Sequence, residues 1–396
     1  MWKKISSLRL THRLKILMVL LCLVSLLSTG LLPVNATNDV LTTTKFAYGA
    51  RIDPWGEQVD FALTSFLASG MDWLGIDFDW QKYWSDRDSS LDLSRLNRVM
   101  GYAHEHNIRV MLSITNPPDW VITNAGPDPI ITTGLVAQLV RLYPETLMAV
   151  ELFPSANTQR GWGAKPNPRA YTVLLEDVSE MLRVAGVNTV LVAAGLTPVD
   201  TQNNPGDMDD LSFLNQLYLN GAAQHMPIVG IRFPALSGEP LDTPWGANSY
   251  VIRHYELIRD EMLNHDHTEG LIWITGFTFP AVNASEQDTQ EDVSKESERT
   301  LAKYQSHWLI QAFYVMKSQL YLGAAFFSCL NPPVVDVKQD EQCLIQNIVG
   351  QPGLHPAFSE LSRMISLENT YKDHINHPDL GKNDFISIIS SMWSSP

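Results

Sequence analysis

The chain has 396 residues, of which 45% are hydrophobic and 18% are charged, and its formal net charge at neutral pH is −15. Such an acidic chain repels the phosphates of nucleic acid and the headgroups of anionic lipid, so neither is an expected partner. The length suits one large barrel domain or two average domains.

The first 36 residues have the order of a secretory signal peptide. Five basic residues and no acidic ones are followed by an apolar run from Ile16 to Leu32 and by the small-residue site Val34-Asn35-Ala36. This order predicts cleavage after Ala36 and a secreted or extracytoplasmic location. The alternative is that residues 1–36 stay as an N-terminal membrane anchor, because the apolar run has 17 residues. Cleavage would change the net charge from −15 to −20, since five basic residues and no acidic ones are removed.

After this segment, short apolar runs alternate with longer amphipathic ones, as in a parallel sheet wrapped by helices. Eight strands are expected, beginning near Phe46, Trp73, Arg109, Ala149, Thr189, Ile228, Gly270 and Leu322. Helices are expected at residues 94–106 and 168–185, and each interval between strands has room for a helix. The pattern predicts an α/β fold, a single-domain (β/α)8 or TIM barrel over residues 37–366, followed by a tail over residues 367–396.

Polar and aromatic side chains follow the predicted strands, at the end of the barrel where such folds place their active sites. Sugars need paired hydrogen-bonding groups and flat rings that stack on their C–H faces, so this set predicts a carbohydrate groove. Helix capping by the aspartates and core packing by the tryptophans are the alternatives, about as probable for any one tryptophan as stacking on a ligand. The candidates are Asp53, Trp55, Asp77, Asp79, Trp80, Asn116, Trp120, Asn157, Trp162, Arg232, Trp245 and Phe277.

Several stretches resemble one enzyme group. The segment AVELFPSANTQRGWGAKPNPRAYTVLLEDVSEMLRVAGVNTVLVAAGL and the pieces WLGIDFDW, TNPPDW and IWITGFTF are similar to clan A glycoside hydrolases, nearest to family 39 and family 5 types. The resemblance covers most of residues 46–365. It implies a (β/α)8 barrel and, in an active member, two catalytic glutamates at the ends of the fourth and seventh strands.

Both glutamates are replaced when the chain is aligned on this resemblance. Ser155 stands at the position of the acid/base, and Gly276 stands at the position of the nucleophile. Gly75 takes the place of an arginine on the second strand, and Arg232 takes that of a histidine on the sixth. Glu151 is a poor substitute, because four residues along a strand correspond to about 13 Å.

The sequence therefore favours a catalytically inactive pseudo-glycosidase that binds an oligo- or polysaccharide or serves as a subunit of a cell-surface assembly with other surface proteins. The alternative is an active hydrolase with relocated carboxylates such as Asp77 and Asp79, paired with Asp53 or Asp242 as in an inverting enzyme. A third reading is a structural barrel whose cleft is filled by its own side chains.

No cofactor or metal ion is expected, because the histidines near residues 265–267 and 374–377 lie in polar segments without a completing ligand cluster. A membrane contact is expected only through an uncleaved N-terminal segment. Cys329 and Cys343 are a disulfide candidate in an oxidising compartment, and two unpaired thiols are an equal alternative.

Overall fold

The computed structural model describes residues 46–233, 236, 239–245, 250–278, 295–333, 343–348 and 351–376. The predicted signal segment 1–36 and the part of the predicted tail from residue 377 onward lie outside the described residues. From Thr44 onward the chain forms one compact unit.

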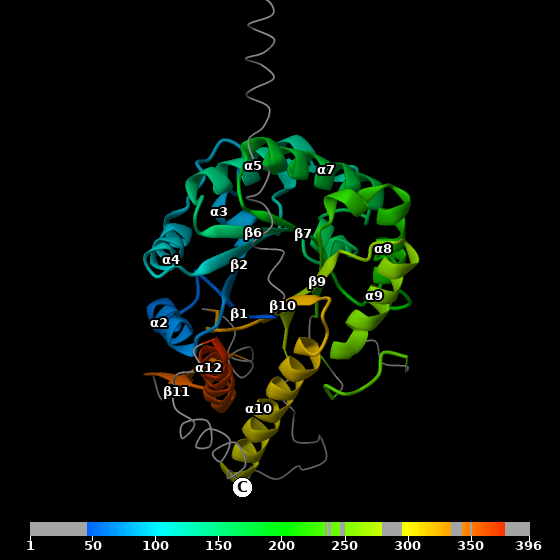
Figure 1. Cartoon of the computed structure of the whole chain (residues 1–396). Coiled ribbons are helices and arrows are strands. Elements are labelled where there is room, and N and C mark those ends of the chain that lie inside the picture. Colours follow the sequence, from blue (N-terminus) through cyan, green and yellow to red (C-terminus); the bar gives the residue numbers. More distant parts are fainter. Residues whose placement is uncertain are drawn as a thin grey trace, which may run out of the picture. The chain divides into compact units, whose positions relative to one another are not determined.

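Eight parallel strands close into a barrel at the centre of this unit (Figure 1). They are β1 (Ala47–Ile52), β2 (Trp73–Asp79), β3 (Arg109–Thr115), β6 (Leu147–Leu152), β7 (Val190–Leu196), β8 (Ile228–Arg232), β9 (Leu271–Phe277) and β10 (Leu322–Phe327). Each strand pairs with the next in this order, and β10 pairs with β1. The predicted (β/α)8 barrel is confirmed, and every strand begins within two residues of its expected position.

Helices surround the barrel and cover the outer face of its strands (Figure 1). They are α2 (Val59–Ser69), α3 (Trp80–Tyr83), α4 (Ser94–Glu105), α5 (Pro129–Leu142), α6 (Gln159–Trp162), α7 (Pro168–Ala185), α8 (Asp210–Leu219), α9 (Tyr255–Asn264), α10 (Lys295–Lys317) and α12 (Pro356–Asn376). Short 3-10 turns lie at Asp119–Val121, Ala222–His225 and Ile252–His254. Two antiparallel pairs complete the structure, β4 (Ile122–Thr123) with β5 (Gly126–Pro127) and β11 (Ile345–Ile348) with β12 (Gln351–Leu354).

Helix ends follow the local sequence signals. Helix α7 begins at Pro168 with the Asn167 side chain accepting from the Ala170 N–H, and it ends at Gly186 in the left-handed conformation, φ 64°. The expected helix at 168–185 is therefore confirmed. Helix α12 continues to residue 376, so the predicted tail boundary at 367 falls inside a helix.

The strands are mostly apolar because both of their faces are buried, one in the barrel and one under the helices. Every residue of β1 and β7 is buried. At its carboxyl end β7 is irregular, with Ala194 at φ 62° and a shift in its register with β8. Buried Tyr171 fixes this bend, since its hydroxyl donates to the Leu152 carbonyl and accepts from the Ala194 N–H. The bend shapes the barrel mouth on that side.

Candidate functional site: a charged pocket at the barrel mouth

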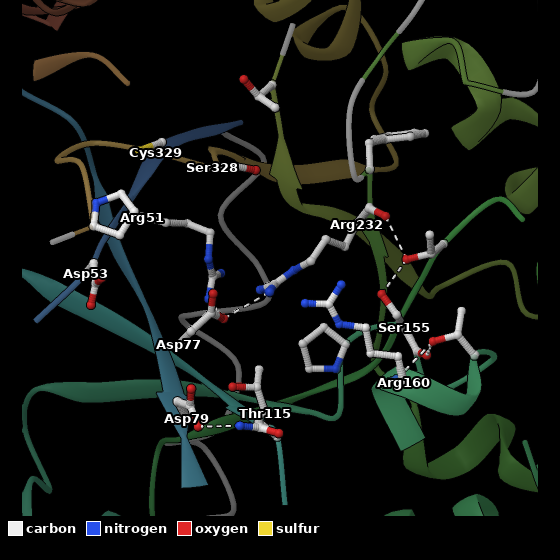
Figure 2. A pocket seen from close by; sticks show the side chains of 18 of the residues that line it. Arg51, Asp53, Asp77, Asp79, Thr115, Ser155, Arg160, Arg232, Ser328 and Cys329 are labelled. Atoms are coloured by element: carbon white, nitrogen blue, oxygen red, sulfur yellow. Dashed lines mark hydrogen bonds and ion pairs between the residues drawn. The ribbon is translucent and has the colours of Figure 1, made fainter. Parts of the chain in front are cut away.

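A pocket of about 1070 Å³ opens at the carboxyl ends of the strands, the end of the barrel where this fold places its sites. Figure 2 shows many of the side chains that line it. Its charged lining residues are Arg51, Asp53, Asp77, Asp79, Lys82, Arg160, Asp207 and Arg232. Its other lining residues include Trp55, Thr115, Asn116, Ser155, Thr197, Ser328, Cys329 and Asn331.

The base of the pocket is a network of five side chains, here called the floor cluster: Arg51, Asp77, Ser113, Glu151 and Arg232. One oxygen of Asp77 accepts from the guanidinium groups of Arg51, at 2.5 Å, and of Arg232, at 2.9 Å. Arg232 also lies 3.1 Å from Glu151, and Ser113 donates to the same Glu151 oxygen. Asp77, Ser113 and Glu151 are register partners on neighbouring strands, so the barrel itself sets this layer.

Burial makes this network costly to break. The side chains of Glu151 and Arg51 are 0% and 4% exposed, whereas the Asp77 side chain is 47% exposed on the pocket side. Desolvation alone would raise the pKa of Asp77, but the positive charges of Arg232 and Arg51 outweigh it and lower that pKa to about 2. Burial and the charge of Arg232 lower the pKa of Arg51. Asp77 is therefore ionised at neutral pH and neutralised by the two arginines.

Arginine side chains also occupy the space beside two glycines of the barrel. A Cβ atom at Gly75 would lie 3.0 Å from Cγ of Arg51. A Cβ atom at Gly276 would lie 3.0 Å from Oγ of Ser328 and 3.3 Å from Cγ of Arg232. A larger side chain at Gly276 would therefore require a shift of its neighbours.

Ser155 follows β6, at the wall of the pocket. Its hydroxyl lies 2.6 Å from that of Thr197, whose hydroxyl donates to the Arg232 carbonyl. Its backbone is left-handed, with φ 63°, and its N–H donates to the carbonyl of Gly195. The turn after β6 is thus fixed against β7.

The remaining wall, here called the rim, includes five lining residues outside the floor cluster: Asp53, Trp55, Asp79, Asn116 and Arg160. The Asp53 carboxylate accepts from the N–H of Trp55, and the Asn116 amide donates to Asp79 at 2.8 Å. Trp55 packs against Tyr83 with a ring-centroid distance of 5.4 Å and is only partly buried. The rim therefore offers an indole ring next to carboxylate and amide groups.

The structure brings together half of the residues that the sequence predicted for the site. Asp53, Trp55, Asp77, Asp79, Asn116 and Arg232 line the pocket. The other candidates, Trp80, Trp120, Asn157, Trp162, Trp245 and Phe277, do not line it.

These six positions differ from the expectation for physical reasons. Trp80, Trp162 and Phe277 are completely buried, so their rings pack in the core. The Asn157 amide is also buried, where it donates to the carbonyls of Thr197 and Met208 and ties two loops together.

The remaining two tryptophans lie elsewhere. Trp120 is half-buried and packs edge-on against Trp84, at a centroid distance of 4.8 Å. Trp245 is 64% exposed and stands outside the pocket.

Two arginines of the pocket were not predicted. Arg51 could have been predicted, because a charged residue inside the otherwise apolar strand AYGARI requires a buried partner. Arg160 lies in the short helix α6, among polar residues, and carries no such signal.

A disulfide joins Cys329 and Cys343, whose Cα atoms lie 4.6 Å apart. Cys329 lines the pocket, and the Leu344 N–H donates to its carbonyl. Close by, the Asn331 side chain accepts from the Asp53 N–H and donates to the Asp53 carbonyl. The loop after β10 therefore supports one side of the rim.

Among the described residues, no group of three or more histidine, cysteine or acidic side chains has the arrangement of a metal site. Within the same part of the chain, no helix combines the length and apolar character of a membrane span.

No protein-family model matches this sequence, and no curated protein matches it. Solved structures do resemble it. A family 39 glycoside hydrolase from Bacteroides cellulosilyticus WH2 superposes with a TM-score of 0.58 at 14% identity, covering 82% of this chain. The match covers 64% of that enzyme, so this chain spans less than two thirds of its length.

Two further enzymes have a similar fold. Xylanase 10B from Thermotoga petrophila RKU-1, solved with xylobiose, has a TM-score of 0.55 at 11% identity, covering 86% of this chain and 99% of that one. A family 1 β-glucosidase from Thermotoga maritima has a TM-score of 0.54 at 11% identity, covering 81% of this chain and 97% of that one. At such low identity the likeness shows a shared fold, the TIM barrel of glycoside hydrolases.

Proposed function

We propose that this chain binds carbohydrate in the pocket at the barrel mouth and does not cleave it. It acts either as a glycan receptor or as a glycan-binding subunit of a cell-surface assembly. The observation that carries the proposal is the floor cluster, in which the carboxylates of Asp77 and Glu151 are already paired with Arg51 and Arg232.

Hydrolysis with retention needs two carboxyl groups about 5 to 5.5 Å apart, one as nucleophile and one as proton donor. The ends of β6 and β9 supply Ser155 and Gly276 instead. Glu151 is fully buried below the pocket, and Asp77, with a pKa near 2, holds no proton to donate at neutral pH. This arrangement supports binding without turnover.

The rim supports carbohydrate as the ligand class. A partly buried indole at Trp55 offers a flat apolar face, and the Asp53, Asp79 and Asn116 side chains offer acceptors and donors for hydroxyl groups. A pocket of about 1070 Å³ is large enough for more than one sugar unit. The fold shared with glycoside hydrolases is consistent with this class.

Calorimetric titration with a panel of oligosaccharides tests the proposal. At least one glycan should bind with a dissociation constant in the micromolar to millimolar range. Trp55→Ala should weaken that binding about tenfold or more, since an indole face buries apolar area worth at least about 1.4 kcal/mol. Trp245→Ala is the matched control, because Trp245 is exposed outside the pocket. Absence of binding by every glycan up to about 10 mM rejects the proposal, because the expected dissociation constants lie in the micromolar to millimolar range.

The second candidate is an active hydrolase. Asp77 and Asp79 are two residues apart on β2, so their side chains share one face, and both line the pocket. Turnover of aryl glycosides well above the buffer rate, abolished by Asp79→Asn, would establish this candidate and overturn the non-catalytic one.

We also propose that the protein works outside the cytoplasm. The signal-like order of residues 1–36 and the Cys329–Cys343 disulfide support this location. Intact-mass measurement of native protein should give a chain that begins at Thr37 with no thiol open to alkylation, whereas a mass that includes residues 1–36 contradicts cleavage.

A further inference from the structure

Four cationic side chains line the pocket, and three of them have carboxylate partners. Arg51 and Arg232 share Asp77, and the Lys82 ammonium lies 3.6 Å from Asp79. Arg160 is exposed and makes no hydrogen bond or ion pair within the part of the chain that the structure describes. It is thus the cation of the pocket that remains available.

The backbone that carries Arg160 is held firmly. The Thr158 hydroxyl accepts from the Gly161 N–H at 2.9 Å and donates to the Ser155 carbonyl at 2.9 Å. The next turn is anchored by Trp162, which is completely buried and donates its indole N–H to the Ala125 carbonyl. The fold therefore fixes the position from which the arginine side chain extends.

The backbone at Gly161 packs closely against the preceding turn. A Cβ atom at Gly161 would lie 2.2 Å from the carbonyl oxygen of Ser155, so the close approach of the two backbones requires glycine. The Gln159 N–H donates to the Asp207 carboxylate at 2.8 Å and closes the other side. In Figure 2 the guanidinium of Arg160 points into the pocket, toward the side where Asp77 and Arg232 lie.

The acidic groups of the pocket have other contacts. Asp77 is held by two arginines, Asp79 accepts from Asn116 and the Lys82 N–H, and Asp207 accepts from Gln159. An unpaired guanidinium presents five N–H donors in a planar fork that matches the two oxygens of a carboxylate or a sulfate group. Its fixed anchor removes part of the entropy that binding would otherwise cost.

We propose that the carbohydrate bound in this pocket is anionic, and that Arg160 binds its acidic group. The acidic group is a carboxylate of a uronic acid unit or a sulfate ester, and the uncharged hydroxyls of the same unit contact the rim at Asp53, Asp79 and Asn116. The inference rests on the proposed function, since it assigns the class of glycan that the same pocket takes.

Titration with matched ligands tests this assignment. Three oligosaccharides of one length are compared: an oligouronate, the same compound after reduction of its carboxyl groups, and a sulfated counterpart. At least one anionic ligand should bind about tenfold more tightly than the reduced, neutral one, as expected for one charge-assisted hydrogen-bonded pair. This preference should shrink as salt is raised. The tighter of the two anionic ligands identifies the carboxylate or the sulfate as the recognised group.

Arg160→Gln should lower the affinity for the anionic ligand about tenfold more than the affinity for the neutral one. Arg160→Lys should retain part of the preference, because the charge remains and the planar fork is lost. Arg183→Gln is the matched control: it removes the same charge from an exposed site on α7 outside the pocket. Circular dichroism checks that each variant is folded.

The outcomes separate this inference from the function on which it rests. Equal binding of neutral and anionic glycans, or an equal loss of both in Arg160→Gln, overturns the anionic assignment and leaves carbohydrate binding in place. Absence of binding by every glycan overturns both.

Discussion

The floor and the rim of the pocket both contain arginine and acidic side chains, yet their arginines are paired in different ways. On the floor, Arg51, Arg232 and Glu151 are paired with one another or with Asp77 and are largely closed to water. On the rim, Arg160 has no such partner in the described chain. The number of charges in a pocket therefore says less about binding than whether those charges are already paired.

The floor and the rim should also differ in how much their charged side chains contribute to the free energy of unfolding. Removing one partner of a buried ion pair leaves an uncompensated charge and costs about 3 to 5 kcal/mol, whereas an exposed pair contributes about 0 to 1 kcal/mol. Substitutions on the floor should therefore appear mainly as losses of stability, and substitutions on the rim mainly as losses of binding.

The largest effect is expected for Glu151→Ala. It leaves the half-buried Arg232 and the buried Ser113 without one of their acceptors, so the free energy of unfolding should fall by about 3 to 5 kcal/mol in denaturant titration. Glu176→Ala, at an exposed position on α7, is the matched control and should stay within about 0.5 kcal/mol of the unchanged protein. If the two variants lose equal stability, the floor does not have the structural role assigned to it.

The next effect concerns the support of the rim. Replacing Cys329 and Cys343 by serine opens a link with a sequence separation of 14 residues, which should cost about 3 kcal/mol of stability. Thermal unfolding of the double variant and of the unchanged protein under reducing conditions should agree. A variant as stable as the oxidised protein would show that the loop after β10 needs no covalent support.

A smaller, pH-dependent effect is expected at Asp77. Its pKa falls from 3.8 to about 2 on folding, so the carboxylate stabilises the folded state above about pH 4, and this contribution is lost as the pH falls through about 2. The shift corresponds to about 2.4 kcal/mol, which screening reduces to about 1 kcal/mol because the side chain is 47% exposed.

Unfolding of the unchanged protein and of Asp77→Asn, measured between pH 6 and pH 2, tests this contribution. The stability difference between them should shrink by about 1 kcal/mol as the pH falls. A difference that stays constant over this range would mean that the two arginines do not hold Asp77 in its charged form.

The fold was predictable from the sequence because parallel barrel strands are buried on both faces. Runs such as the one in β9 are mostly apolar and buried, and such runs can be recognised in the sequence. The spacing between such runs then gives the number of units. Helix α7 was equally clear, since proline and glycine mark its two ends.

The site was only partly predictable, because strand ends are visible in a sequence while the direction of a loop side chain is not. Trp80 and Trp55 both follow strands, yet Trp80 is completely buried and Trp55 lines the pocket. Whether Arg160 reaches the pocket depends on the turn at Phe153 and Ser155, whose backbones are left-handed with φ 48° and 63°. Neither residue is a glycine, so the sequence did not predict this turn. A charged residue inside an apolar strand, such as Arg51, needs a buried partner and therefore indicates a polar cluster inside the barrel.

The smallest effect on stability is expected for Arg160→Ala. This variant gives the most direct test of the difference between the floor and the rim. Arg160 is exposed and makes no hydrogen bond or ion pair with the described chain, so its loss should change the free energy of unfolding by less than about 0.5 kcal/mol. Arg232→Ala removes the same side chain from the floor, where it contacts Asp77 and Glu151, and should cost several kcal/mol, on the order of 3 to 5. Denaturant titration of the two variants side by side measures the difference directly. Comparable losses would mean that Arg160 has structural partners of its own, and the division between a structural floor and a binding rim would then fail.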